Sequence, residues 1–171
     1  ETYFVCLQEF AHCSARWPAK GRRFSGGSRL VGNPAKPSDS AVLLSSRWLY
    51  VRWRAHTHFA LGVVAEDRLG TLVLVVSVYL PRRSSPLEQF RSASADMDAM
   101  VTTAKRRFRG RLASTIVVGD YNVELFTHLG GVGPLGTVEP HPDARQILVL
   151  EFVEKCGLGP ANTFLPAQTS R

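Results

Sequence analysis

Residues 115–124 read Thr-Ile-Val-Val-Gly-Asp-Tyr-Asn-Val-Glu, so an apolar run of strand length ends in a carboxylate and a carboxamide. The β-branched residues predict a buried β-strand, and open α/β sheets place reactive groups at the carboxyl ends of their strands. Asp120 and Asn122 are two residues apart, which predicts that both side chains leave the same face of that strand. A carboxylate can hold or orient Mg²⁺ while an amide donates to a phosphoryl oxygen, which suggests phosphodiester chemistry. The alternative is a plain turn, because Asp and Asn after a strand commonly bond their local backbone.

Two further apolar segments end in polar groups. Residues 3–9 read Tyr-Phe-Val-Cys-Leu-Gln-Glu and stop at Glu9. Residues 70–81 read Gly-Thr-Leu-Val-Leu-Val-Val-Ser-Val-Tyr-Leu-Pro, which is typical of a strand covered on both faces. Pro81 cannot extend a central ladder, so this strand is expected to finish near Tyr79. The sequence therefore predicts three strand ends that carry polar side chains at one rim.

These segments resemble, in order and spacing, motifs of the endonuclease/exonuclease/phosphatase superfamily, which includes deoxyribonuclease-I-like enzymes and apurinic/apyrimidinic endonucleases. The matching stretches are residues 7–9 (Leu-Gln-Glu), 77–81 (Ser-Val-Tyr-Leu-Pro) and 119–122 (Gly-Asp-Tyr-Asn). Further along, residues 143–158 followed by Asn-Thr-Phe at 162–164 are similar to endonuclease domains of non-LTR retrotransposons. The resemblance covers nearly the whole chain.

The resemblance implies a role for each matching residue. Glu9 looks like the family's metal-binding glutamate, and Gln8 accompanies it without being assigned as a ligand. Tyr79 looks like the tyrosine that hydrogen-bonds the scissile phosphate. Asp120 resembles the aspartate that orients or activates the attacking water, and Asn122 resembles the amide that steadies the phosphate. Mg²⁺ is the implied cofactor, with Mn²⁺ as an alternative.

The chain also departs from the family pattern at both ends. Family members carry an Asn upstream of the Gln-Glu motif, and an Asp segment followed by a His-containing pair downstream. None of the five histidines fills that last place by order; they are His12, His56, His58, His128 and His141. We therefore expect either a fragment of a longer protein or a decayed copy that keeps the scaffold. The 171 residues alone are expected to show weak or no turnover.

Composition predicts one compact domain over residues 1–171, since 44% hydrophobic and 20% charged residues are ordinary for a globular chain. The net charge of +7 favours association with polyanions without sequence preference, and it also suits a soluble basic protein. Arg82 and Arg83 follow Tyr79 closely and are predicted to bind nucleic acid. The cations of residues 105–111 are predicted to close a helix, where they offset its C-terminal dipole.

Cysteine usage indicates reduced thiols in an intracellular protein, because Cys6, Cys13 and Cys156 are odd in number and lack metal-ligand spacing. Cys6 lies in an apolar strand and is predicted to fill the core. No apolar run of about 18 residues appears, so no membrane span is expected. Action on DNA would place the protein in the nucleus.

The remaining periodicities give the expected elements. Residues 59–65 and 71–79 are predicted to pair as a hairpin through the turn 67–70, and residues 86–108 and 143–155 are predicted to be helices. Residues 41–44 and 48–53 read as short strands, and residues 14–40 as an irregular loop rich in Gly, Pro, Ser and Arg. His56 and His58 would share a strand face, either as a metal pair or, more simply, as an exposed face.

Together these elements predict an α/β fold: a two-sheet α/β sandwich of the deoxyribonuclease-I-like type, with mixed strands and outer helices, incomplete at both ends. The first functional hypothesis is a Mg²⁺-dependent DNA-nicking endonuclease of a retrotransposon polyprotein, with a reverse-transcriptase domain downstream in the same polypeptide. A phosphatase or phosphodiesterase of the same superfamily, acting on a small phosphorylated molecule, is the second. A noncatalytic nucleic-acid-binding remnant is the third.

Overall fold

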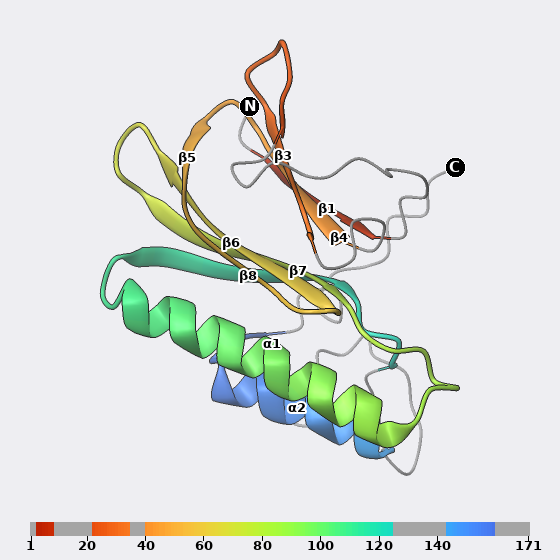
Figure 1. Ribbon diagram of the computed structural model, residues 1–171. Helices are drawn as coiled ribbons and strands as arrows, with labels where there is room; N and C mark the ends of the chain where they lie inside the picture. Colours follow the sequence, from red (N-terminus) through yellow and green to blue (C-terminus); the bar gives the residue numbers. More distant parts are fainter. Residues whose placement is uncertain (1–2, 9–21, 35–39, 125–142, 160–171) are drawn as a thin grey trace, which may run out of the picture.

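The computed structural model describes residues 3–8, 22–34, 40–124 and 143–159, which form two facing β-sheets and two helices. Both helices lie on the outer side of one sheet, and the other sheet covers its opposite side (Figure 1). Glu9, Cys13, the glycine-rich stretch 130–136 and the Asn-Thr-Phe stretch 162–164 lie outside the described residues.

The first sheet is antiparallel and has the order β1-β4-β3-β2. Its strands are β1 (Phe4–Gln8), β4 (Ser40–Leu44), β3 (Arg29–Gly32) and β2 (Arg22–Arg23). The prediction of an irregular loop over residues 14–40 is therefore wrong for β2 and β3, which form a hairpin. Gly27 permits the turn between them with a φ of 80°, and fully buried Val31 anchors β3 in the core.

The second sheet is mixed and has the order β5-β6-β7-β8. Its strands are β5 (Trp48–His56), β6 (Ala60–Asp67), β7 (Leu72–Tyr79) and β8 (Leu112–Asp120). β6 and β7 pair as the predicted antiparallel hairpin, whereas β7 and β8 are parallel. The parallel pair needs a long crossover, which helix α1 (Leu87–Arg107) supplies as predicted.

Two details of this sheet differ from the sequence-based expectation. β8 is half-exposed and lies at the edge of the described sheet, with Val118 45% exposed, so it is not the buried strand that its apolar run predicted. His56 ends β5 and His58 lies in the following turn, so the two do not share a strand face. The turn forms because the Thr57 hydroxyl accepts hydrogen bonds from the backbone N–H groups of Phe59 and Ala60.

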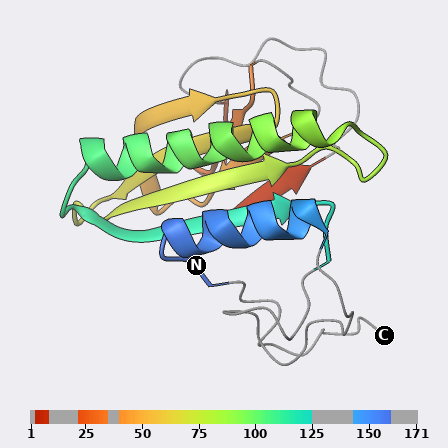
Figure 2. The same ribbon diagram turned by 90° about the horizontal axis from the view of Figure 1, so that it is seen from below.

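Helix α2 (Ala144–Lys155) lies beside α1 and runs in the same direction (Figures 1 and 2). Asp143 begins it with a capping box, and Gly157, with a φ of 61°, follows its end. The Arg145 guanidinium donates to the Ser85 carbonyl at the start of both helices. The Lys105 ammonium donates to the Cys156 carbonyl at their other end.

Two hydrophobic cores hold these layers together, one between the sheets and one under the helices. β7 supplies both, because Val73 and Val75 point to the first sheet while Leu74 and Val76 point to the helices. The structure confirms the predicted two-sheet α/β sandwich with mixed strands and outer helices, an arrangement consistent with the deoxyribonuclease-I-like type. Among the described residues, no helix combines the length and apolarity needed to cross a membrane.

Gly119 lets β7 and β8 approach closely, and its replacement tests this packing. A Cβ at Gly119 would lie 1.8 Å from the Val78 carbonyl oxygen, so Gly119→Ala should separate the strands. The expected loss in free energy of unfolding is roughly 3 kcal/mol or more, measured by denaturant titration. Gly159→Ala is the matched control, because nothing lies within 4 Å of its Cβ. Equal stability of the two variants would contradict this packing.

Candidate active site at the strand-end rim

Tyr79 and Asp120 are the last residues of β7 and β8, and they are direct partners in the parallel register. Directly opposed residues of parallel strands send their side chains to the same face of the sheet. Alternation along β7 identifies this face, because Val75 packs in the core between the two sheets and Tyr79 is four residues further on. Both side chains therefore face the layer that contains β1. We call this end of the second sheet the strand-end rim.

Asn33 joins the two sheets at this rim. Its buried amide nitrogen lies 2.9 Å from the Thr57 carbonyl oxygen, 3.4 Å from the Ala60 carbonyl oxygen and 3.2 Å from the Ser40 hydroxyl. One side chain thus bonds to β4 and to both arms of the turn between β5 and β6. Sequence analysis missed Asn33, because it lies in the stretch predicted as an irregular loop and its partners are distant along the chain.

This connection fixes where β1 ends. Gln8, the last residue of β1, is paired with Ser40, and Ala60 is paired with Val78, one residue before Tyr79. β1 also packs across β7 and β8, and its arrow ends on the same side as theirs (Figure 1). The backbone of Gln8 therefore lies at the strand-end rim. Glu9 follows Gln8 in the sequence, and its predicted role as a metal ligand stays a prediction.

Asp120 and Asn122 form a turn directly after β8. The Asn122 backbone N–H donates to the Asp120 carboxylate at 2.9 Å, and the Asn122 side-chain amide donates to the Leu80 carbonyl at 2.8 Å. Asn122 has a φ of 52°, a left-handed conformation that Asn tolerates better than most residues. The prediction that both side chains leave one strand face is wrong, because β8 ends at Asp120 and the backbone turns.

The turn holds the exposed Asp120 carboxylate in place through one of its oxygens. Within the described part of the chain, no hydrogen bond reaches its second oxygen, so that oxygen can meet a cation or a water. The Asn122 side-chain amide uses one N–H in its bond to Leu80, so its second N–H and its oxygen can still bind a ligand. The turn-forming and ligand-binding readings of this pair are therefore compatible.

The rim has a positive electrostatic setting. Arg82 and Arg83 are exposed in the turn between β7 and α1, where the Ser85 N–H donates to the Arg82 carbonyl at 2.9 Å. Both helices also begin at this end, since Arg145 at the start of α2 bonds to Ser85 just before α1. A helix N-terminus carries partial positive charge; no side chain caps α1, whereas the Asp143 carboxylate already caps α2. An anionic ligand is therefore favoured at the strand-end rim.

Two nearby ionisable groups are held neutral. Burial raises the pKa of the Cys6 thiol to about 11, against the lowering effect of a hydrogen bond with Ser77. Burial also raises the pKa of the Tyr121 phenol, whose side chain packs against the core under the helices. Neither group supplies an anionic nucleophile near neutral pH. This agrees with the prediction that Cys6 fills the core.

The donors at the rim fit a hard divalent cation. Mg²⁺ takes oxygen ligands and is typically bound by one or two carboxylates together with water and substrate phosphates. Asp120 offers a carboxylate oxygen, and the Asn122 amide oxygen belongs to the same turn, two residues further along the chain. No group of three or more His, Cys, Asp or Glu side chains with metal-binding geometry occurs among the described residues.

The predicted basic segment 105–111 does not flank this rim. α1 runs from the rim to the opposite end of the sheet, and Lys105, Arg106 and Arg107 lie in its last turn. The prediction that these cations close a helix is confirmed.

Comparison with known proteins yields similarity to solved structures. No protein-family model matches the sequence, and no curated protein matches it. Among solved structures, the chain is similar to the human Nocturnin catalytic domain with bound sulfate anion, at 18% sequence identity and a TM-score of 0.45. The similarity covers 57% of this chain and 44% of that chain, so this chain spans less than half of that structure's length.

The left-handed Asn122 turn can be tested by two substitutions. Asn122→Ala removes the bond to Leu80 and also strains the backbone, whereas Asn122→Gly removes the bond but accepts the positive φ. We expect Asn122→Gly to be the more stable variant by about 1 kcal/mol in free energy of unfolding, measured by denaturant titration. An alanine variant as stable as the glycine variant would contradict the observed turn.

Proposed function

We propose that this chain carries catalytic residues of a Mg²⁺-dependent phosphodiester hydrolase of the endonuclease/exonuclease/phosphatase superfamily, with DNA as its substrate. The observation that carries the proposal is the pairing of Tyr79 with Asp120 on one sheet face, at the end of the sheet where β1 also ends. Carboxylate, phenol and amide groups thus lie together at the strand-end rim, where the electrostatic potential is positive.

In this proposal, Asp120 orients the attacking water. The Asn122 N–H holds one carboxylate oxygen, so the other oxygen has a fixed direction in which to accept a hydrogen bond from water. Removing a positioned general base or water-orienting group typically lowers the rate by roughly 10²–10⁴-fold. The turn at residues 120–122 is thus a positioning device for the carboxylate.

Tyr79 and Asn122 hold the phosphate in the proposed site. The Tyr79 phenol donates a hydrogen bond to a phosphoryl oxygen, and the remaining Asn122 amide N–H donates to another. Arg82, Arg83 and the uncapped N-terminus of α1 add positive potential where charge develops on the phosphoryl oxygens. A bound Mg²⁺ or Mn²⁺, with Glu9 and Asp120 as its proposed protein ligands, would offset charge on the phosphoryl and leaving oxygens.

The charge of the protein favours a polymeric substrate over a small one. A net charge of +7 raises the local concentration of a polyanion, and the Arg82–Arg83 pair extends the positive surface away from the reacting phosphate. We further propose that the chain nicks target DNA in the nucleus as part of a retrotransposon polyprotein that carries a reverse transcriptase. Hydrolysis of a small phosphorylated molecule by the same rim is the second candidate, because the roles of Asp120 and Tyr79 do not depend on the leaving group.

Plasmid nicking tests the proposal. The protein, expressed from its complete reading frame, should convert supercoiled plasmid to the open circle in Mg²⁺ but not in EDTA, and Asp120→Asn should lower the rate by at least about 10²-fold. Asp96→Asn is the matched control, because Asp96 is exposed on α1 away from the turn at residues 120–122. Thermal unfolding of both variants verifies folding.

Equal nicking by Asp120→Asn and the unaltered protein would overturn the assignment. Cleavage of bis-p-nitrophenyl phosphate and p-nitrophenyl phosphate separates the two candidates. Turnover of these small esters without plasmid nicking would favour a small phosphorylated substrate. Unchanged plasmid, with neither ester cleaved, would favour the noncatalytic remnant.

A further inference from the structure

A second basic surface lies at the end of the molecule opposite the strand-end rim. Residues 105–111 read Lys-Arg-Arg-Phe-Arg-Gly-Arg, which gives this short segment five cations and no acid. All five basic side chains are exposed. We call this surface the basic cap, and its members are Lys105, Arg106, Arg107, Arg109 and Arg111.

The positive charge of the basic cap exceeds what the fold requires there. α1 and α2 both end at this surface, and each helix C-terminus is equivalent to roughly half a negative charge. Lys105 already donates to the Cys156 carbonyl at the end of α2, and Lys155 pairs with Asp98. Two helix ends therefore offset about one unit of the five positive charges. Four arginines remain in excess.

Those arginines have no acidic partners in the described part of the chain. The ion pairs found there involve Arg47, Arg52, Arg91 and Lys155, and none involves Arg106, Arg107, Arg109 or Arg111. Four neighbouring guanidinium groups repel one another, which costs stability unless a counter-charge binds. The cap therefore has the charge pattern of a surface that meets an anionic partner.

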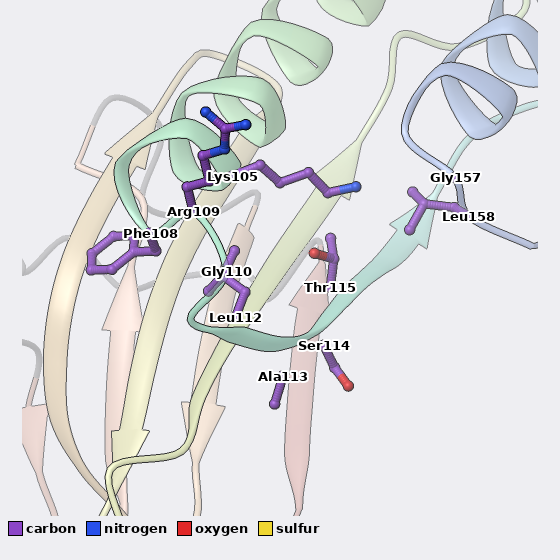
Figure 3. Close-up of a pocket in the computed structure, with 10 residues that line it drawn as sticks. All are labelled: Lys105, Phe108, Arg109, Gly110, Leu112, Ala113, Ser114, Thr115, Gly157 and Leu158. Atoms are coloured by element: carbon purple, nitrogen blue, oxygen red, sulfur yellow. The ribbon is translucent and has the colours of Figure 1, made fainter.

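The basic cap borders an open hollow of about 420 Å³ between the end of α1, the start of β8 and the end of α2 (Figure 3). Lys105 and Arg109 line it together with Thr115, which lies on the Lys105 side of β8, whereas the Ser114 hydroxyl points to the other side of the strand (Figure 3). A bulge opens β8 at this point, because Leu112 pairs with Leu72 while Ser114 pairs with the next residue of β7. Two cationic side chains and the Thr115 hydroxyl thus border one recess.

We propose that the basic cap binds the sugar–phosphate backbone of nucleic acid at a second contact surface, separate from the strand-end rim. β8 spans nine residues between Leu112 at the cap and Asp120 at the rim, a length of roughly 26 Å. Backbone contacts by arginine are bidentate and independent of base sequence. This binding requires no catalysis, so it can be tested independently of the proposed hydrolysis.

A nucleic acid fits the cap better than an anionic membrane surface. Surfaces that insert into a bilayer place exposed Trp, Phe or Leu side chains beside their cations. Here Phe108 is 8% exposed, and Leu112 and Leu158 are only partly exposed. The cap therefore offers positive charge and a hydroxyl group without an apolar anchor.

Salt-dependent binding of a labelled duplex of about 20 base pairs tests the proposal, with EDTA present so that no cleavage occurs. The variant Arg106→Gln/Arg109→Gln/Arg111→Gln should lower the affinity on the order of tenfold at moderate salt. It should also reduce the slope of log affinity against log salt by about 0.9 for each phosphate that the variant no longer neutralises. The matched control is Arg22→Gln/Arg23→Gln/Arg68→Gln, which removes the same charge from other exposed positions.

The charge-retaining variant Arg106→Lys/Arg109→Lys/Arg111→Lys should keep most of the slope, and it guards against a loss caused by misfolding. An unchanged slope in the glutamine variant would overturn the proposal, and so would an equal loss in the control. Binding to phosphatidylserine vesicles that depends on these arginines, with duplex binding unchanged, would overturn it in favour of a membrane. If Asp120→Asn abolishes nicking but leaves duplex binding unchanged, the result would support binding at the basic cap and hydrolysis at the strand-end rim as separate activities.

Discussion

The parallel pairing of β7 with β8 is the constraint on which the rest of the structure depends. Parallel neighbours cannot be joined by a tight turn, so the chain must cross back over the sheet, and α1 does so on its outer face. The same pairing aligns the two strand ends and sets Tyr79 beside Asp120. It also places the start of α1 at the rim and its basic end at the far side. One pairing thus separates an anion-attracting rim from an arginine-rich cap.

The second requirement is that the first sheet be held in register with the second. The core between the sheets is made largely of aliphatic side chains, which pack well without fixing a position along the strands. Asn33 supplies that position, because a buried amide must find its hydrogen-bond partners and here finds them on both sheets. The end of β1 is thereby kept at the strand-end rim.

Much of this fold could be predicted from local patterns in the sequence, whereas its remaining features depend on distant contacts. The β-branched run at residues 72–79, the turn 67–70 and the apolar periodicity of residues 87–107 each specify their element locally, and the strand ends at Tyr79 and Asp120 follow from the same patterns. By contrast, β3 carries only two apolar residues, and its burial against β4 decides its conformation. The hydrogen bond from the Asn122 side chain to the Leu80 carbonyl joins residues that are 42 positions apart in the sequence. The edge position of β8 depends on the order of the strands in the sheet, and an apolar run of residues does not reveal that order.

Paramagnetic broadening by Mn²⁺ in the NMR spectrum of ¹⁵N-labelled protein tests most directly whether the strand-end rim is a cation site. If the ion binds between the ends of β1, β7 and β8, the backbone amides of Gln8, Leu80 and Asn122 should broaden first as Mn²⁺ is added. The amides of Arg109 and Ser114, at the other end of the sheet, should stay sharp. Broadening centred elsewhere, with sharp signals from Leu80 and Asn122, would contradict the account.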